Sequence, residues 1–224
     1  MPVNSEAYKK IAAELKDKNV TLVAVSKTKP VEDILELYQL GQRDFGENYV
    51  QELVDKYEQL PKDIRWHFIG HLQSNKVKLI APFITLIHSV DTQKLLREIN
   101  KQAIKNDRII DCLLQDHIAK EETKFGLDEE ELKELLTTDF KDFKNVTLKG
   151  LMGMASFTDN AEIVRKEFQF LKSLFDKYST LQTTNYKLQT LSMGMSSDYK
   201  MAIEEGSNMV RIGSLLFGER AAKK

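Results

Sequence analysis

Short apolar runs alternate with longer amphipathic runs along the sequence, and this alternation limits the fold more than any other feature. The apolar runs are rich in β-branched residues, which is typical of strands buried on both faces. Amphipathic runs of helical period separate most of them, as the crossovers between parallel strands require. The eight predicted strands cover residues 19–26, 43–46, 64–70, 85–90, 108–115, 147–155, 187–193 and 209–212.

The helical pattern that follows the first predicted strand is the clearest in the chain. Pro30 suits the opening turn of a helix, and Glu32 and Asp33 complement the helix dipole there. Gly41 is suited to end the helix in a left-handed cap. Further helices are predicted over residues 5–16, 49–60, 93–105, 129–137 and 161–178.

The number of predicted strands indicates the architecture. Dividing 224 residues among eight units gives 28 residues for each, which is enough for a strand, a helix and two short loops. We therefore predict an α/β fold, a single (β/α)8 TIM barrel with an extra helix at residues 5–16, and one domain over residues 1–224. An open doubly wound sheet is the alternative.

Composition narrows the class of protein. The 33 basic and 34 acidic residues give a net charge of -1, and no long block of like charge indicates binding to nucleic acid or a membrane surface. No run of about 18 apolar residues predicts a membrane span, and the polar start of the chain does not resemble a secretory signal. The single cysteine, Cys112, lies in an apolar run and is predicted to pack in the core. We expect a cytoplasmic protein.

Lys27 is the most informative residue at a strand end. In the stretch LVAVSKTKP it follows the first apolar strand, and sites in such barrels form where strands end. A surface lysine at a strand end is ordinary. Placement after a wholly apolar run, however, favours a partly desolvated amine with a lowered pKa, which attacks a carbonyl as a free base. A lysine that forms a Schiff base is therefore a reasonable prediction.

The last predicted strand carries a second candidate group. Arg211 is flanked by apolar residues, so it needs an acceptor inside the barrel, and a salt bridge to Asp91 is the structural alternative. Beyond it, Gly213 lets the backbone approach a ligand closely. The amides of Gly213 and Ser214, with the hydroxyls of Ser196, Ser197 and Ser214, are suited to surround a phosphate, and phosphate sites in these barrels often follow strands seven and eight.

A lysine nucleophile, a phosphate site and an internal arginine together suggest pyridoxal 5'-phosphate (PLP) as the cofactor. The aldehyde would meet Lys27, and the ring nitrogen would meet Arg211. An arginine at that nitrogen disfavours its protonation and weakens the ring as an electron sink. No metal site is predicted, because His67 and His71 in WHFIGH lie on a strand, where four residues span about 13 Å. Asp116 and His117 are interpreted as polar lining near the barrel mouth.

Six motifs, in order, closely resemble those of the pyridoxal phosphate homeostasis proteins. They are AVSKTKP, FGENYVQEL, WHFIGHLQSNKVK, GLMGMAS, LSMGMSSDYKMAI and MVRIGSLLFGER, and the resemblance runs from about Val20 to Arg220. It implies a barrel similar to the N-terminal domain of alanine racemase. It also implies a Schiff-base lysine at Lys27, and the remaining implied PLP contacts are Asn48, Ser196, Arg211, Gly213 and Ser214. Asn48 is identified by the resemblance alone.

The resemblance also indicates what kind of function to expect. Alanine racemase has a second domain that supplies a catalytic tyrosine, and this chain ends soon after the last predicted strand, so we expect no such domain here. The implied role is binding, buffering and delivery of PLP by a monomer, with PLP-dependent apo-enzymes as recipients and no catalytic residue. Asp116 and His117 depart from the family pattern, which leaves the rim of strand five without a predicted role.

Two enzymatic functions remain as alternatives. A small PLP-dependent amino-acid racemase needs a second acid-base group opposite Lys27, for which Tyr49, His71 and His117 are the candidates. A cofactor-free aldolase would use Lys27 with sugar phosphates.

Overall fold

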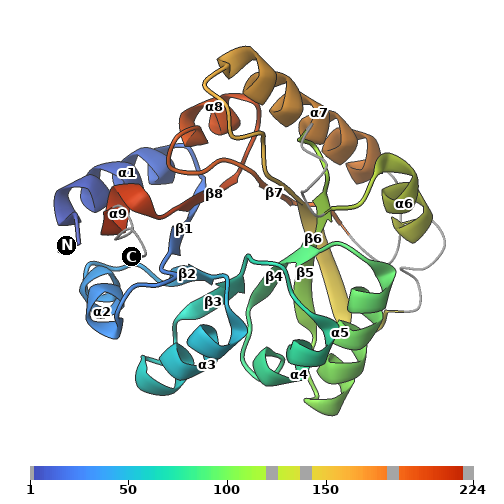
Figure 1. Ribbon diagram of the computed structural model, residues 1–224, viewed down its shortest axis with the longest axis horizontal. Coiled ribbons are helices and arrows are strands. Elements are labelled where there is room, and N and C mark those ends of the chain that lie inside the picture. The colour runs from blue at the N-terminus through green and yellow to red at the C-terminus, as the bar shows by residue number, and fades with distance from the viewer. Residues whose placement is uncertain (1–2, 120–125, 137–142, 181–186, 219–224) are drawn as a thin grey trace.

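Eight parallel strands form a closed barrel in the computed structural model of the chain, in the order β1 to β8 (Figure 1). The structure describes residues 3–119, 126–136, 143–180 and 187–218. The ring closes where β8 pairs with β1, from Thr21 opposite Met209 to Ala24 opposite Ile212. The strands are β1 (Thr21–Val25), β2 (Asp44–Glu47), β3 (Arg65–Phe68), β4 (Leu86–Val90), β5 (Ile110–Asp116), β6 (Val146–Gly153), β7 (Thr190–Ser192) and β8 (Met209–Ile212).

Helices surround the barrel and cover the outer face of its strands (Figure 1). This arrangement confirms the predicted TIM barrel with an extra N-terminal helix, and the alternative of an open sheet is wrong because β1 and β8 pair with each other. The helices are α1 (Ser5–Asp17), α2 (Val31–Gln39), α3 (Val50–Gln59), the 3-10 turn η1 (Ser74–Lys76), α4 (Val77–Ile80), α5 (Gln93–Lys105), α6 (Glu129–Glu134), α7 (Ala161–Ser179), α8 (Tyr199–Glu204) and α9 (Ser214–Phe217).

Polar side chains fix the starts of several helices. Asn4 accepts a hydrogen bond from the backbone N–H of Ala7 at the start of α1, and Thr92 and Asn160 cap α5 and α7 in the same way. Asp128 forms a capping box with Glu131 at the start of α6. Such caps satisfy backbone N–H groups that have no partner inside the helix, and each is typically worth about 1 kcal/mol.

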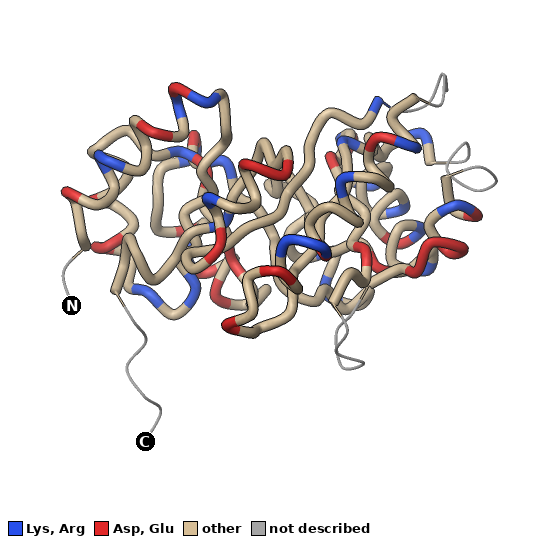
Figure 2. The backbone as a smooth tube through the Cα atoms, turned by 90° about the horizontal axis from the view of Figure 1, so that it is seen from above, with Lys and Arg blue, Asp and Glu red and all other residues tan. Residues whose placement is uncertain are grey.

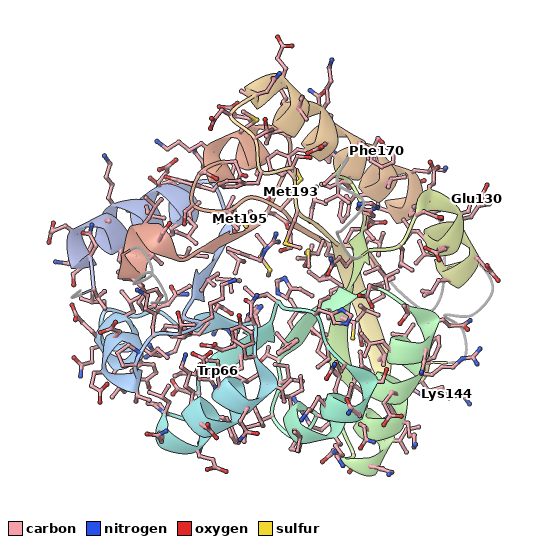
Figure 3. All side chains as sticks on the ribbon, in the orientation of Figure 1. Trp66, Glu130, Lys144, Phe170, Met193 and Met195 are labelled. Carbon is pink, nitrogen blue, oxygen red and sulfur yellow. The ribbon has the colours of Figure 1, made fainter. Side chains whose placement is uncertain are left out.

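Successive side chains on each strand point alternately outward and inward, so the barrel has an outer and an inner core. Side chains that point outward pack against the helices and include Phe45, Trp66 and Cys112, each fully buried. Figure 3 shows Trp66 beside α3, on the helix-facing side of β3. The apolar residues of the smaller cluster in the barrel interior are Val23, Leu86, Leu113, Met152 and Met209. The prediction that Cys112 packs in the core is confirmed.

The boundaries of the elements differ from prediction mainly at the ends. The predicted strand 187–193 is observed as the three residues of β7, and the predicted strand 147–155 begins and ends earlier, as β6. The helix predicted over 129–137 is observed as α6, and residue 137 lies outside the described residues. The short helices α4, α8 and α9 were not predicted.

Charged residues of both signs are interspersed along the described chain. Figure 2 shows Lys and Arg beside Asp and Glu on the same helices and loops. Among the described residues, no helix has the length and apolar character that crossing a bilayer requires.

Candidate functional site

A cavity of about 510 Å³ opens at the carboxyl ends of the strands, where the loops after β1, β2, β6, β7 and β8 meet. All six residues implied as PLP contacts line this one cavity, as does Ser197. The six residues are Lys27, Asn48, Ser196, Arg211, Gly213 and Ser214. The strand order explains their proximity, because β8 lies beside β1, while β2 and β7 flank this pair.

Lys27 lies in a tight turn directly after β1. The turn is closed by a hydrogen bond from the backbone N–H of Lys29 to the carbonyl of Ser26, at 3.0 Å. Thr28 has a φ of 63°, a left-handed conformation that is rare for a β-branched residue. Its backbone N–H donates to the Glu52 carboxylate at 2.5 Å, which holds this conformation. The half-buried Lys27 side chain thereby faces the cavity.

A buried polar cluster, formed by Ser26, Glu47, Glu52 and Lys56, lies behind the Lys27 turn. Lys56 Nζ donates to the carbonyl of Ser26 at 2.8 Å, to Glu47 at 2.7 Å and to Glu52 at 2.6 Å. The Ser26 hydroxyl donates to the same oxygen of Glu47 at 2.7 Å. Burial raises the pKa of Glu47 to about 7, against the opposing effects of Lys56 and Ser26. The cluster therefore holds the backbone on both sides of Lys27, at the carbonyl of Ser26 and at the N–H of Thr28.

Sequence analysis did not find this cluster. Its only local signal is the i, i+4 spacing of Glu52 and Lys56 on α3, which is common on exposed helices. The pairing with Glu47 requires the packing of α3 against β2 and is visible only in the folded chain.

Asn48 follows β2 and brings an amide to the cavity. Its Oδ1 atom is buried and has no hydrogen-bond partner within the described part of the chain. The backbone of Asn48 lies so close to Gly70 that a Cβ at position 70 would be 2.4 Å from the Asn48 carbonyl oxygen. A buried acceptor without a partner is costly, so the site is suited to a ligand that carries a donor.

Arg211 is a buried cation at the base of the cavity, with 4% of its surface exposed. Its Nη1 donates to the carbonyl of Ser192 at 2.9 Å and to the hydroxyl of Ser192 at 2.6 Å, and its Nη2 donates to the carbonyl of Gly153 at 3.0 Å. Burial lowers the pKa of Arg211 to about 10, which the charge of Asp198 partly opposes. The guanidinium is therefore cationic at neutral pH.

The salt bridge between Arg211 and Asp91, considered above as the structural alternative, is wrong. Asp91 instead pairs with His71, whose Nδ1 lies 3.1 Å from the Asp91 carboxylate. The acceptors of Arg211 are all uncharged, so its charge has no carboxylate in hydrogen-bond contact within the described chain.

The loops after β7 and β8 form the third part of the cavity. The backbone N–H of Gly213 donates to the Ser196 hydroxyl at 3.2 Å, which joins the two loops. A Cβ at Gly213 would lie 3.2 Å from the carbonyl oxygen of Val25, so a side chain there would crowd the end of β1. Ser214 begins α9, and its exposed side chain lines the cavity. The arrangement of hydroxyls and backbone amides at one edge is suited to an anion.

The lining also includes Lys29, Met195 and Phe157, which were not predicted. Lys29 donates to the carbonyls of Phe217 at 2.7 Å and Gly218 at 3.3 Å, which ties the first loop to the last helix. Met195, labelled in Figure 3, follows β7, and Phe157 after β6 is 94% exposed. Their proximity to the six predicted residues depends on loop paths that the sequence pattern does not reveal.

Other polar residues singled out in the sequence lie elsewhere. Tyr49, His71 and His117, the three acid-base candidates for a racemase, are not among the residues that line this cavity. Asp116 ends β5 but is not among the residues that line this cavity, and its buried carboxyl group has no hydrogen bond in the described structure. Burial raises the pKa of Asp116 well above its usual range.

The fold and this cavity together define a class of protein. The chain matches the sequence profile of the family described as alanine racemase, N-terminal domain, over residues 5–221. Curated relatives and solved structures narrow the class further. The chain is 46% identical to the pyridoxal phosphate homeostasis protein of Aquifex aeolicus, with 89% of this chain and 86% of that protein covered. Identity to the protein of the same name from Vibrio alginolyticus is 43%, with 90% and 87% covered.

A solved structure shows the same fold. PipY of Synechococcus elongatus PCC7942, determined with PLP bound, is 35% identical and superimposes with a TM-score of 0.83, covering 92% of this chain and 98% of that one. The chain therefore belongs to the family of pyridoxal phosphate homeostasis proteins.

Proposed function

We propose that this protein binds PLP as a Schiff base with Lys27 and acts in intracellular PLP homeostasis, holding the cofactor and releasing it to apo-enzymes. The observation that carries the proposal is the convergence of a lysine, a buried cation and an anion-binding edge on one cavity in a chain of this family. PLP supplies an aldehyde, which condenses with a lysine amine and releases one water molecule.

Each part of the cavity suits a different part of PLP. The Lys27 amine is assigned to the aldehyde, and the Ser196 and Ser214 hydroxyls, with the Gly213 backbone, to the phosphate. Arg211 is assigned to the ring nitrogen. The Oδ1 atom of Asn48, which accepts no hydrogen bond within the described chain, is assigned to the pyridine ring of the cofactor. Three basic side chains at the cavity, Lys27, Lys29 and Arg211, favour a ligand that carries negative charge.

Arg211 also favours binding of PLP over catalysis with it. An arginine donates to a ring nitrogen and so disfavours its protonation, and an unprotonated ring is a weaker electron sink for carbanion chemistry. A site of this kind retains the cofactor while activating substrates poorly. We propose that the protein has no catalytic turnover.

Borohydride reduction tests the covalent bond. The protein mixed with PLP is expected to absorb near the edge of the visible range, to lose this band on reduction, and to carry the pyridoxyl mass on the peptide that contains Lys27. Lys27→Ala is expected to abolish the label. Lys29→Ala is the matched control, since Lys29 lines the same cavity but its amine is held by two backbone carbonyls, and it is expected to retain the label. A label on Lys29, or an unlabelled wild-type protein, contradicts the proposal.

The remaining parts of the proposal have separate tests. We propose that the protein acts as a monomer in the cytoplasm, which light scattering and cell fractionation test. Release to recipients is tested by activation of a PLP-dependent apo-enzyme after mixing with the loaded protein. Exchange of the α-proton of an L-amino acid in deuterated water would instead support the racemase alternative, and imine trapping with a sugar phosphate in the absence of PLP would support the aldolase alternative.

A further inference from the structure

A continuous row of polar side chains crosses the interior of the barrel, beside its apolar cluster. His88 and Ser192 are fully buried, and His67 and Arg211 are each less than 5% exposed. Polar groups in such a place are costly unless they are hydrogen-bonded to one another. We call this row of hydrogen-bonded side chains the interior chain. Its members are Asp44 on β2, His67 on β3, His88 on β4, Ser192 on β7 and Arg211 on β8.

The interior chain is continuous from one end of the barrel to the other. Asp44 Oδ1 lies 3.0 Å from His67 Nε2, and His67 Nδ1 lies 2.9 Å from His88 Nε2. His88 Nδ1 lies 3.2 Å from the Ser192 hydroxyl, which accepts a hydrogen bond from Arg211 Nη1 at 2.6 Å. Asp44 begins β2, whereas Arg211 lines the cavity at the opposite end.

The two ends of the interior chain give it a direction. A guanidinium only donates hydrogen bonds, and an ionised carboxylate only accepts them. With both histidines neutral, Ser192 accepts from Arg211 and donates to His88 Nδ1. His88 then donates from Nε2 to His67 Nδ1, and His67 donates from Nε2 to Asp44. Each histidine therefore carries its proton on Nε2, and no link has two donors or two acceptors facing each other.

The neutral state of His88 has a physical cause. Its ring is completely buried, and burial is the largest cause that holds its pKa well below the usual value, with the charge of Arg211 acting in the same direction. A cationic His67 would add a second positive charge to an interior that already holds Arg211.

The Ser192 hydroxyl is the member of the interior chain that is hydrogen-bonded to Arg211. Two of the three acceptors of Arg211 are backbone carbonyls, whose polarity is fixed. The third is the Ser192 hydroxyl, whose proton rotates. Donation to His88 keeps this proton away from the guanidinium and leaves a lone pair for Nη1. Arg211 is then held by three hydrogen bonds, and two of its five N–H groups have none within the described chain.

We propose that Asp44, His67, His88 and Ser192 are positioning residues for Arg211, which orient its two remaining N–H groups toward the ligand in the cavity. The identity of that ligand's acceptor as the ring nitrogen of PLP rests on the proposed function. The proton positions along the interior chain do not depend on it.

The first experiment reads the proton positions directly, in protein without PLP. Long-range proton–nitrogen correlation spectra distinguish the two neutral tautomers and the cation of each histidine. The sequence has four histidines, so His71→Gln and His117→Gln variants assign the other two. We expect His67 and His88 each to be neutral with the proton on Nε2 at pH 7. A proton on Nδ1 of either ring overturns the proposal.

The second experiment separates positioning from a merely structural role. It compares the binding of PLP with that of the PLP analogue in which a C–H group replaces the ring nitrogen. We expect Ser192→Ala and His88→Leu to weaken PLP binding about tenfold and to leave binding of the analogue unchanged, because the analogue makes no bond to Arg211. His88→Gln, which keeps one donor and one acceptor, is expected to restore PLP binding.

Other outcomes are equally informative. Equal weakening for both compounds shows that the interior chain only stabilises the barrel and overturns the positioning role. If the wild-type protein binds neither compound, the proposed function and the coupling to PLP both fail, while the first experiment still decides the tautomers. Should His88→Leu fail to fold, Ser192→Ala, which removes a single hydroxyl, carries the comparison.

Discussion

At the scale of the residue, the charge of Arg211 is the dominant feature of the site. Its acceptors are two carbonyls and one hydroxyl, and none is charged. An ion held this way retains much of its attraction for an electron-rich ligand, because no carboxylate in the described chain is hydrogen-bonded to it, and the charge of Asp198 only partly offsets it. The chain stabilises the cation with dipoles and keeps its charge available at the cavity.

Asp44, at the other end of the interior chain, gives a prediction about pH. Burial raises the pKa of Asp44, but the hydrogen bonds from Arg65 and His67 and the charge of Arg65 outweigh burial and lower it to about 2, from an ordinary value of 3.8. A carboxyl group whose pKa is lowered by folding stabilises the fold at every pH above its pKa in the unfolded chain. This stabilisation is lost as the pH falls from about 4 to about 2. The contribution at neutral pH is about 2 kcal/mol.

Urea denaturation at a series of pH values measures this contribution. Asp44→Asn is expected to lower the free energy of unfolding by about 2 kcal/mol at pH 7 and by progressively less below pH 4. Asp17→Asn is the matched control, because Asp17 is exposed at the end of α1, and its profile is expected to follow the wild type. A pH-independent difference between Asp44→Asn and wild type contradicts the assignment.

At the scale of the element, the ends of β2 and β3 approach each other closely. A Cβ at Gly70 would lie 2.4 Å from the Asn48 carbonyl oxygen, so Gly70→Ala must displace the backbone that positions Asn48. We expect the free energy of unfolding to fall by about 1–3 kcal/mol, as for other overpacked sites. We also expect PLP binding to weaken.

Gly150→Ala is the matched control for this effect. A Cβ at Gly150 would collide with the backbone of Thr190 on β7, and Gly150 does not line the cavity. It is expected to lower stability at least as much as Gly70→Ala while leaving the PLP affinity of the folded protein unchanged. Parallel losses of affinity in the two variants would show that stability alone controls binding. Urea denaturation and equilibrium dialysis provide the two measurements.

The elements also show what the sequence predicts and what it does not. All eight strands and the longer helices were predicted, because their apolar residues repeat with a clear period over several residues. Helices α4, α8 and α9 have four to six residues, which gives a weak period, whereas the six residues of α6 lie in the longer amphipathic run 129–137 that was predicted. The six cavity residues were predicted from their places at strand ends or by resemblance. The pairing of Lys56 with Glu47 and the partners of His88 were not predicted, because these partners lie on separate strands and meet only in the closed barrel.

At the scale of the whole molecule, the barrel is expected to unfold as one unit. Every strand pairs with two neighbours, so opening one pair exposes both cores to water. The single tryptophan, Trp66, is buried between β3 and the helices and reports on the outer core. Tryptophan fluorescence and far-ultraviolet circular dichroism are expected to give one coincident transition, in agreement with one domain over residues 1–224. Two separated transitions would contradict a single domain.

The meeting of β1 and β8 has a consequence during synthesis. The lysine assigned to the aldehyde follows the first strand, and the residues assigned to the phosphate follow the last two. A ribosome exposes the Lys27 amine well before it exposes the loops after β7 and β8. On the proposed function, stable binding of PLP is therefore expected to begin only when β8 docks against β1, and a copy that lacks this strand is expected to bind no PLP stably.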